Sequence, residues 1–232
     1  MILLFCLLIL VVETPKIIIE PRKFVVPFQV GDAFFYEIKG HQLSNDTDLQ
    51  HKGNMSFIVL MRNSSYIEIK EMKYEIVSGF RDMEPEYVEF HPVSYALIDI
   101  HSRELFPFEM SVWHWVDPTS VDPGEAVSIV GESMTLLEKT KWMTASDSRN
   151  ALHFQANISL IQRGNMFEAF WYDCYYDAEY GFPLQFSTHF RLWEEYSCRT
   201  LQEPLSTKIE NRTISSSSYS IIFSQTNATF FH

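Results

Sequence analysis

The sequence predicts an all-β or β-rich fold: an antiparallel, strongly curved sheet, or a half-barrel or sandwich, with few helices. Apolar residues recur mainly with a period of two rather than 3.6. Clusters of Gly, Pro, Asp and Asn separate the alternating runs at intervals typical of antiparallel domains. Helical spacing occurs in residues 132–143, but Ser and Thr are scattered through that segment, so we expect it to be a strand or irregular.

The expected strands follow one another along the chain. The first is 34–38 (FFYEI), which follows a turn at 30–32, and the second is 55–61 (MSFIVLM). Further strands are expected near 66–72, 87–90, 95–100, 112–116, 126–130, 152–160, 166–176 and 184–192. The last two flank a hairpin loop in which Gly181 takes the position that requires a positive φ. No linker divides this series, so residues 15–200 are expected to form one β-rich globular domain.

Both ends of the chain differ from this body. Residues 1–12 (MILLFCLLILVV) are uninterrupted apolar residues. They are too few for a helix that spans a bilayer, which needs about 20 residues. Residues 1–14 are therefore expected to be a signal peptide, or a short N-terminal anchor if the leader is uncleaved. Residues 201–232 are polar and Ser-rich and are expected to form a tail resembling a stalk.

Composition narrows the class of partner. The hydrophobic fraction of 46% and the aromatic fraction of 15% predict a well-filled core and argue against disorder in the body of the chain. The net charge of -12 argues against nucleic acid, or an anionic membrane surface, as the partner.

Six of the eight asparagines lie in N-x-Ser/Thr sequons, where about one would be expected by chance. They are Asn45, Asn54, Asn63, Asn157, Asn211 and Asn227. A sequon is an acceptor only where the chain is exposed and enters a glycosylating compartment. The excess therefore predicts an N-glycosylated extracellular or cell-surface protein of the secretory pathway. Residues 66–156 contain no sequon, and we expect a partner to dock within that segment.

The cysteines leave two alternatives open. If Cys6 leaves with the leader, Cys174 and Cys198 remain. They form a disulfide in an oxidising compartment, or Cys174 is a small buried residue and Cys198 is free. Neither has a CxxC partner or a histidine at metal-ligand spacing, so no metal site and no cofactor is expected.

Two aromatic segments are candidate contact surfaces. On a strand, Trp113, Trp115 and Asp117 would share one face, either as a platform on which a sugar or another ligand stacks or as part of the core. Residues 166–176 carry bulky side chains on both faces. They either pack in a core or line an apolar-ligand cavity, as in lipid-carrier half-barrels, with Phe170, Trp171 and Tyr172 as the lining. One face of this strand would hold Phe167, Ala169, Trp171, Asp173 and Tyr175.

Catalytic patterns are weak. The chain has neither G-x-S-x-G nor H-E-x-x-H. Asp99 and His101 would share one strand face, with Arg103 two residues further, as a catalytic dyad or an ordinary surface pair. No catalytic residue is assigned.

Three short motifs carry a resemblance. They are 115–118 (WVDP), 124–131 (GEAVSIVG) and 175–184 (YYDAEYGFPL). Their order resembles that of uncharacterised secreted, β-rich archaeal surface proteins, over about residues 28–193. The resemblance implies an extracytoplasmic antiparallel β domain in an organism that N-glycosylates its surface, and it supplies no catalytic residues.

Together these patterns predict a structural or binding module at the cell surface, with a protein or a glycan as its partner. The alternative is a carrier of an apolar small molecule in a half-barrel cavity. A hydrolase built on Asp99 and His101 is a third hypothesis.

Overall fold

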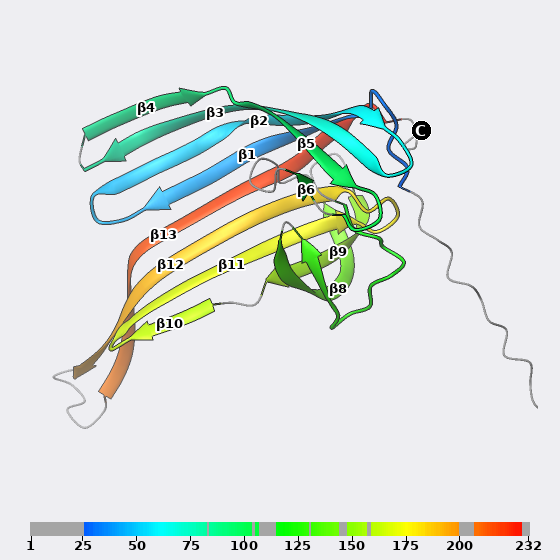
Figure 1. Ribbon diagram of the computed structural model, residues 1–232. Coiled ribbons are helices and arrows are strands. Elements are labelled where there is room, and N and C mark those ends of the chain that lie inside the picture. The colour runs from blue at the N-terminus through cyan, green and yellow to red at the C-terminus, as the bar shows by residue number, and fades with distance from the viewer. Residues whose placement is uncertain are drawn as a thin grey trace, which may run out of the picture.

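The computed structural model confirms the all-β, antiparallel class (Figure 1). It describes residues 26–82, 84–103, 105–106, 115–129, 131–143, 148–156, 159–199 and 207–228. Within these residues there are thirteen strands and no helix, and all the strands belong to one open sheet.

Eleven strands form one continuous path, β6-β5-β3-β2-β1-β13-β12-β11-β9-β8-β7, while β4 pairs with β3 and β10 pairs with β11. The strands are β1 (Ala33–Leu43), β2 (Thr47–Arg62), β3 (Tyr66–Arg81), β4 (Glu84–Phe90), β5 (Val93–Asp99), β6 (Leu105–Phe106), β7 (Ala126–Ile129), β8 (Glu132–Met143), β9 (Ser148–Ala156), β10 (Ser159–Arg163), β11 (Met166–Asp177), β12 (Pro183–Arg199) and β13 (Thr207–Thr226).

The polar C-terminal segment lies at the centre of the sheet. β13 is the longest strand and pairs with β1 on one side and β12 on the other. The expected tail over 201–232, and the domain end at residue 200, are therefore wrong for residues 207–226. Two neighbouring strands satisfy the backbone polar groups of β13, so this strand does not need an apolar sequence to be stable. Near the C-terminal end of β13, Ile221 and Phe223 point to the same side of the strand and join the core.

Most of the other expected strands are confirmed, and residues 132–143 form β8. Residues 152–160, expected to form a single strand, are divided between β9 and β10. These two strands pair with different segments of β11. In the strand expected at 112–116, residues 112–114 lie outside the described residues. Trp115 and Val116 are in a loop.

The sheet has two chemically different faces. Residues directly opposite on paired strands point to the same side. We call one side the covered face; it carries the buried Tyr36, Ile38 and Ile221. The other side is the open face, on which the side chains of Glu37 and Lys39 are more than half exposed.

Loop aromatics fill the space over the covered face. Phe28 contacts Phe34 and Trp115 edge to face, with ring centroids 5.4 and 5.9 Å apart. Trp115 joins a core cluster with β1, β2, β3 and β5. The next residue, Val116, joins a second cluster with β8, β9, β11 and β12. The loop after residue 114 therefore packs between the two parts of the core.

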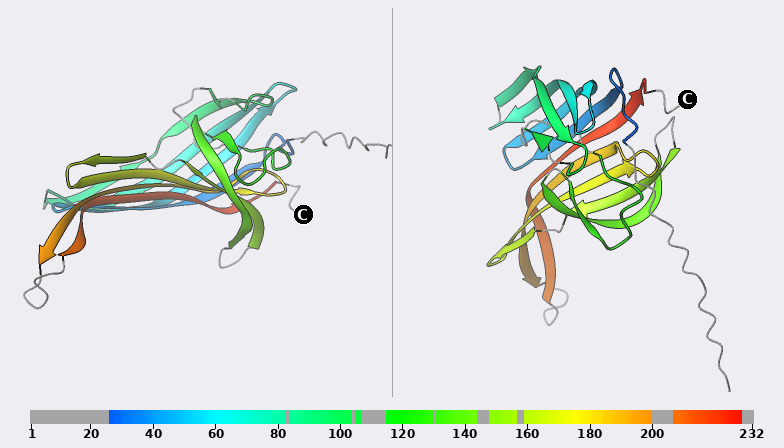
Figure 2. Two further views of the ribbon diagram at one scale, coloured as in Figure 1. Left: turned by 90° about the horizontal axis from the view of Figure 1, so that it is seen from below. Right: turned by 45° about the vertical axis from the view of Figure 1, so that its right-hand side comes forward.

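The sheet is strongly curved. In the left view of Figure 2, the far ends of β12 and β13 bend to one side, and the ends of β8 and β9 lie on that same side. Trp142, near the end of β8, donates a hydrogen bond from Nε1 to Oε1 of Gln185, near the start of β12, over 3.4 Å. Gln185 belongs to the open face through its pairing with Ile222, which pairs with Glu37. The end of β8 thus borders the open face near the start of β12.

The expected hairpin between β11 and β12 is confirmed. Gly181 has a φ of 73°, and a Cβ at this position would lie 2.0 Å from the carbonyl oxygen of Val116. Asp177 Oδ1 accepts the backbone N–H groups of Glu179 and Tyr180 at 2.9 and 2.8 Å. The turn therefore requires glycine for both its backbone conformation and its close contact.

Candidate functional site on the open face

Of the two alternatives for the tryptophan segment 113–117, a ligand platform or part of the core, the core is confirmed for Trp115. Trp115 is 1% exposed and belongs to the core. Asp117 accepts the backbone N–H and the hydroxyl of Thr119 through Oδ1, at 2.8 and 2.7 Å, so its carboxylate stabilises a turn. Trp113 lies outside the described residues. Two of the three expected contact residues are thus structural.

Phe170, Trp171 and Tyr172 do not line one cavity. Phe170 and Tyr172 share a face and contact each other edge to face, 4.9 Å apart. Trp171 points to the opposite face because successive strand residues alternate. There it stacks on His189, with ring centroids 5.1 Å apart.

Of the two alternatives for the cysteines, the register excludes the disulfide, and Cys174 is confirmed as a small buried residue. Cys174 pairs with Phe186 on β12, and Cys198 lies twelve residues further along that strand. Twelve residues of strand span about 40 Å. A disulfide needs Cα atoms within about 7 Å of each other. Cys174 is a buried free thiol, and burial raises its pKa well above the usual range.

Asp99 stabilises a turn rather than forming a dyad with His101. Its Oδ1 accepts the backbone N–H groups of His101 and Ser102 at 2.7 and 2.8 Å. These bonds hold the pKa of the Asp99 carboxyl below its usual value. Arg103 follows with a φ of 62°. The hydrogen bonds of Asp99 therefore give its carboxylate a structural role in the turn.

The sequon asparagines have different surroundings. Asn45 and Asn63 lie in the turns before and after β2, and Asn54 lies in the middle of β2; all three are exposed. Asn227 is exposed, but its Oδ1 accepts the backbone N–H of Ala33 at 2.6 Å. Asn211 is on β13, but its side chain is not among the described parts of the structure. Asn157 lies outside the described residues.

Three stacked ring pairs follow β11 on the open face, and we call them the aromatic row. Phe167 stacks on Trp193, Trp171 on His189, and Tyr175 on His153. The interplanar angles are 13°, 16° and 5°, and each pair joins directly opposite residues of neighbouring strands. Successive members on β11 lie four positions apart, which is about 13 Å along the strand. All six side chains are partly exposed.

Asp173 lies within the aromatic row. His153 Nε2 is 3.2 Å from Asp173 Oδ1, and His189 Nε2 is 3.6 Å from Oδ2. Gln155 Nε2 also donates to Oδ1 at 3.3 Å. Burial, followed by the charges of Asp173 and Glu138, raises the pKa of Tyr175 above its usual value. The row thus combines apolar ring surface with a carboxylate, imidazoles, an amide and a phenol.

The face pattern of β11 could be read from the sequence, because Phe167, Trp171, Asp173 and Tyr175 alternate with residues of the other face. Their partners could not be, because they depend on the register of β9 and β12. His153 and His189 carry no motif of their own in the sequence. Only the pairing brings both imidazoles to one carboxylate.

A second polar cluster lies on the covered face, and we call it the Glu75 network. Glu75 is 5% exposed. Its Oε1 lies 2.8 Å from His51 Nδ1, and its Oε2 pairs with the Lys73 ammonium and accepts the Tyr219 hydroxyl at 3.3 Å. Gly40 leaves room for this cluster, because a Cβ there would lie 3.0 Å from His51 Cβ and 3.1 Å from the Tyr219 ring.

The charges in the Glu75 network compensate one another. Burial raises the pKa of Glu75, but hydrogen bonds from Lys73 and His51 outweigh it, so the pKa lies below the usual value. Burial lowers the pKa of Lys73, but hydrogen bonds with Glu75 and Tyr219 outweigh it, so that pKa is raised. Burial is the main reason that the pKa of Tyr219 rises to about 12. This cluster is a closed set of partners that stabilises the sheet.

Comparisons with known proteins do not add a family. No known family matches the chain, and no curated protein matches it either. Within the described part of the chain, no group of three or more His, Cys, Asp or Glu side chains is placed to hold a metal ion. The same residues include no helix long and apolar enough to cross a membrane.

Proposed function

We propose that the protein is an extracytoplasmic, N-glycosylated module that binds carbohydrate on the aromatic row. The stacked pairs centred on Trp171 and Asp173 carry this proposal. Sugar rings present a C–H face that packs on aromatic rings, and their hydroxyls need donors and acceptors at fixed positions. The row supplies both within one stretch of β11. The sequon excess and the apolar leader support a location outside the cytoplasm.

The composition of the two faces favours a carbohydrate over an apolar ligand. On the covered face, where a half-barrel carrier would hold its cargo, rings of the chain itself, from Phe28, Trp115 and Phe182, pack into the core. On the open face, the rings alternate with Asp173 and imidazoles. An apolar ligand would remove water from those polar groups and offer them no hydrogen bond in return.

The position of the row modifies the expectation for docking. The sequon-free segment 66–156 includes His153, but the other five ring residues lie on β11 and β12. No sequon lies between residues 160 and 210 either, but Asn211 on β13 pairs with Glu195, two residues beyond Trp193 on β12. A glycan on Asn211 would therefore lie beside the Trp193 end of the row, whereas Trp171 and its partner His189 lie further along the strands.

An oligosaccharide array tests the proposal. Protein made in a host that does not N-glycosylate is applied to neutral and acidic oligosaccharides, and hits are titrated by calorimetry. We expect Trp171→Ala to weaken binding at least tenfold. Tyr95→Ala is the matched control, because it removes an aromatic residue that is half exposed on β5. Equal affinities for wild type and Trp171→Ala, or no carbohydrate bound by folded wild type, would overturn the proposal.

A further inference from the structure

Asn54 differs from the other exposed sequon asparagines in its place in the sheet. It lies in the middle of β2, an interior strand, and its direct neighbours are Glu37 on β1 and Tyr74 on β3. A sugar attached there begins on the surface of the sheet rather than at the tip of a turn. Its first residues therefore have protein on both sides.

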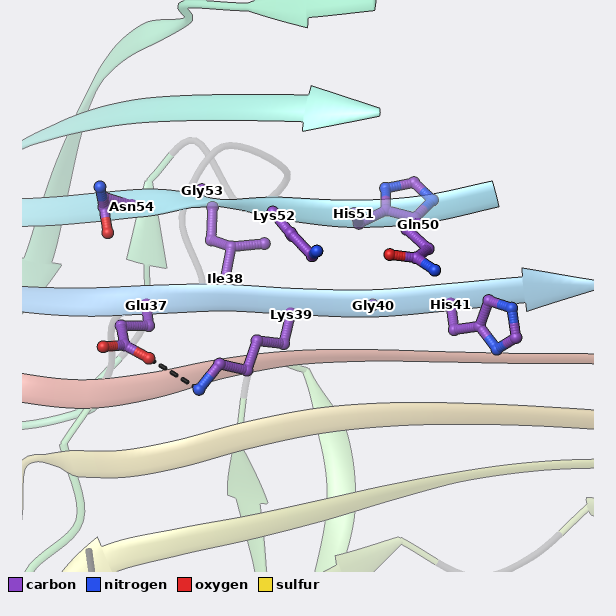
Figure 3. Close-up of a pocket in the computed structure, with 10 residues that line it drawn as sticks. All are labelled: Glu37, Ile38, Lys39, Gly40, His41, Gln50, His51, Lys52, Gly53 and Asn54. Carbon is purple, nitrogen blue, oxygen red and sulfur yellow. Dashed lines mark ion pairs between the residues drawn. The ribbon is translucent and has the colours of Figure 1, made fainter. Parts of the chain in front are cut away.

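Two shallow pockets of the open face meet at Asn54, and it is the one residue that lines both. One pocket, of about 450 Å³, is formed by β1 and β2 and includes Lys39 and Lys52 (Figure 3). The other, of about 460 Å³, is lined in part by Phe35, Met72 and Tyr74. Both volumes are in the range of small-molecule sites.

We propose that a glycan on Asn54 packs into these pockets and becomes part of the folded structure; this inference rests on the proposed N-glycosylation. Phe35 and Tyr74 offer rings for the apolar face of the first sugars. Phe35 is 37% exposed, and a sugar laid on it covers apolar surface that otherwise faces water. On the other side, the ammonium of Lys39 and the carboxylate of Glu37 offer a donor and an acceptor to sugar hydroxyls.

Glycans on Asn45 and Asn63 lack this setting. Asn63 Oδ1 accepts the backbone N–H groups of Ser65 and Tyr66, both at 2.7 Å, which fixes the carboxamide in a turn. Asn45 is exposed in the turn between β1 and β2. Neither Asn45 nor Asn63 lines either pocket. We expect their glycans to project into solvent, which makes these two sites matched controls for Asn54.

Thermal unfolding of glycosylated protein tests the inference. The protein is made in a host that N-glycosylates, and peptide mass spectrometry establishes which sequons are occupied. We expect Asn54→Gln to lower Tm by about 2–4 °C, and Asn45→Gln and Asn63→Gln to leave it within about 1 °C. The same three variants made without glycosylation measure the effect of each substitution itself, which is subtracted. Phe35→Ala should lower Tm more with the Asn54 glycan present than without it.

The outcomes separate this inference from the proposed function. An unoccupied Asn54, or a corrected Tm loss no larger than that of Asn45→Gln, would overturn the inference. Neither result affects the array experiment, which uses protein without glycans. Failure of carbohydrate binding on the array would in turn leave the Tm comparison intact.

Discussion

Each face of the sheet holds a cluster in which a carboxylate contacts imidazole, and the two clusters differ in burial and in their other partners. Glu75 is almost fully buried and has the Lys73 ammonium as a partner. Asp173 is partly exposed, and its ion-pair partners among the described residues are two imidazoles, with no ammonium or guanidinium. Burial and the presence of an ammonium partner therefore distinguish the clusters.

This difference assigns the clusters different roles. A buried carboxylate remains charged only where hydrogen bonds and an opposite charge replace the lost water. The Glu75 network meets that condition within the protein and has little capacity left for a ligand. The Asp173 group retains contact with water, so a ligand hydroxyl can replace solvent there. Substitutions should therefore change stability in the first cluster and binding in the second.

The largest expected effect is that of Lys73→Met, which removes the ammonium and leaves a buried carboxylate. We expect a loss of about 3–5 kcal/mol in the free energy of unfolding, measured by urea denaturation. Lys39→Met is the control, because it breaks an exposed ion pair with Glu37 and should cost less than about 1 kcal/mol. Adding Glu75→Gln to Lys73→Met should restore part of the loss. Equal losses for the two lysine variants would contradict the comparison.

The next effect is on the pH dependence of stability. The pKa of Glu75 is lowered in the folded protein, so its contribution is present above the ordinary value of 4.5 and is lost as the pH falls through the folded-state pKa. The stability difference between wild type and Glu75→Gln should therefore shrink below pH 4.5. Unfolding curves at several acidic pH values measure it. A constant difference would show that the charge of Glu75 is not what stabilises the network.

Sequence reasoning predicted the periodic parts of this molecule and missed what depends on pairing. Strands such as 55–61 alternate clearly, and Gly181 identifies its hairpin. β13 was missed because its serines carry no apolar signal, although two neighbours make it the centre of the sheet. For Trp115 the sequence left a ligand platform and the core open, because burial is a tertiary property. The register of β11 and β12, which the sequence does not reveal, excludes the Cys174–Cys198 pairing. The same register determines the partners of Asp173.

A smaller effect is expected from the stacked pair of Trp171 and His189. Their direct contact on opposite strands should give a coupling of about 0.5–1.5 kcal/mol in a double-mutant cycle with Trp171→Ala and His189→Ala. Urea denaturation of the four proteins measures it. A coupling near 3 kcal/mol would mean that the row is as structural as the Glu75 network, and the contrast between the faces would fail.

The smallest effect on stability is expected from Asp173→Asn, which keeps the shape of the side chain and removes its charge. Because Asp173 is partly exposed and has no ammonium partner in the described structure, we expect a change within about 0.5 kcal/mol. Binding should respond differently, since a charged acceptor forms stronger hydrogen bonds to hydroxyls than an amide does. We expect at least a tenfold loss of affinity for any oligosaccharide bound by the wild type. Asp48→Asn is the matched control, because Asp48 is exposed and also contacts one imidazole, that of His41 at 2.9 Å, outside the aromatic row. If both variants bound like the wild type, Asp173 would be one more satisfied surface carboxylate, and the distinction between the two clusters would rest on burial alone.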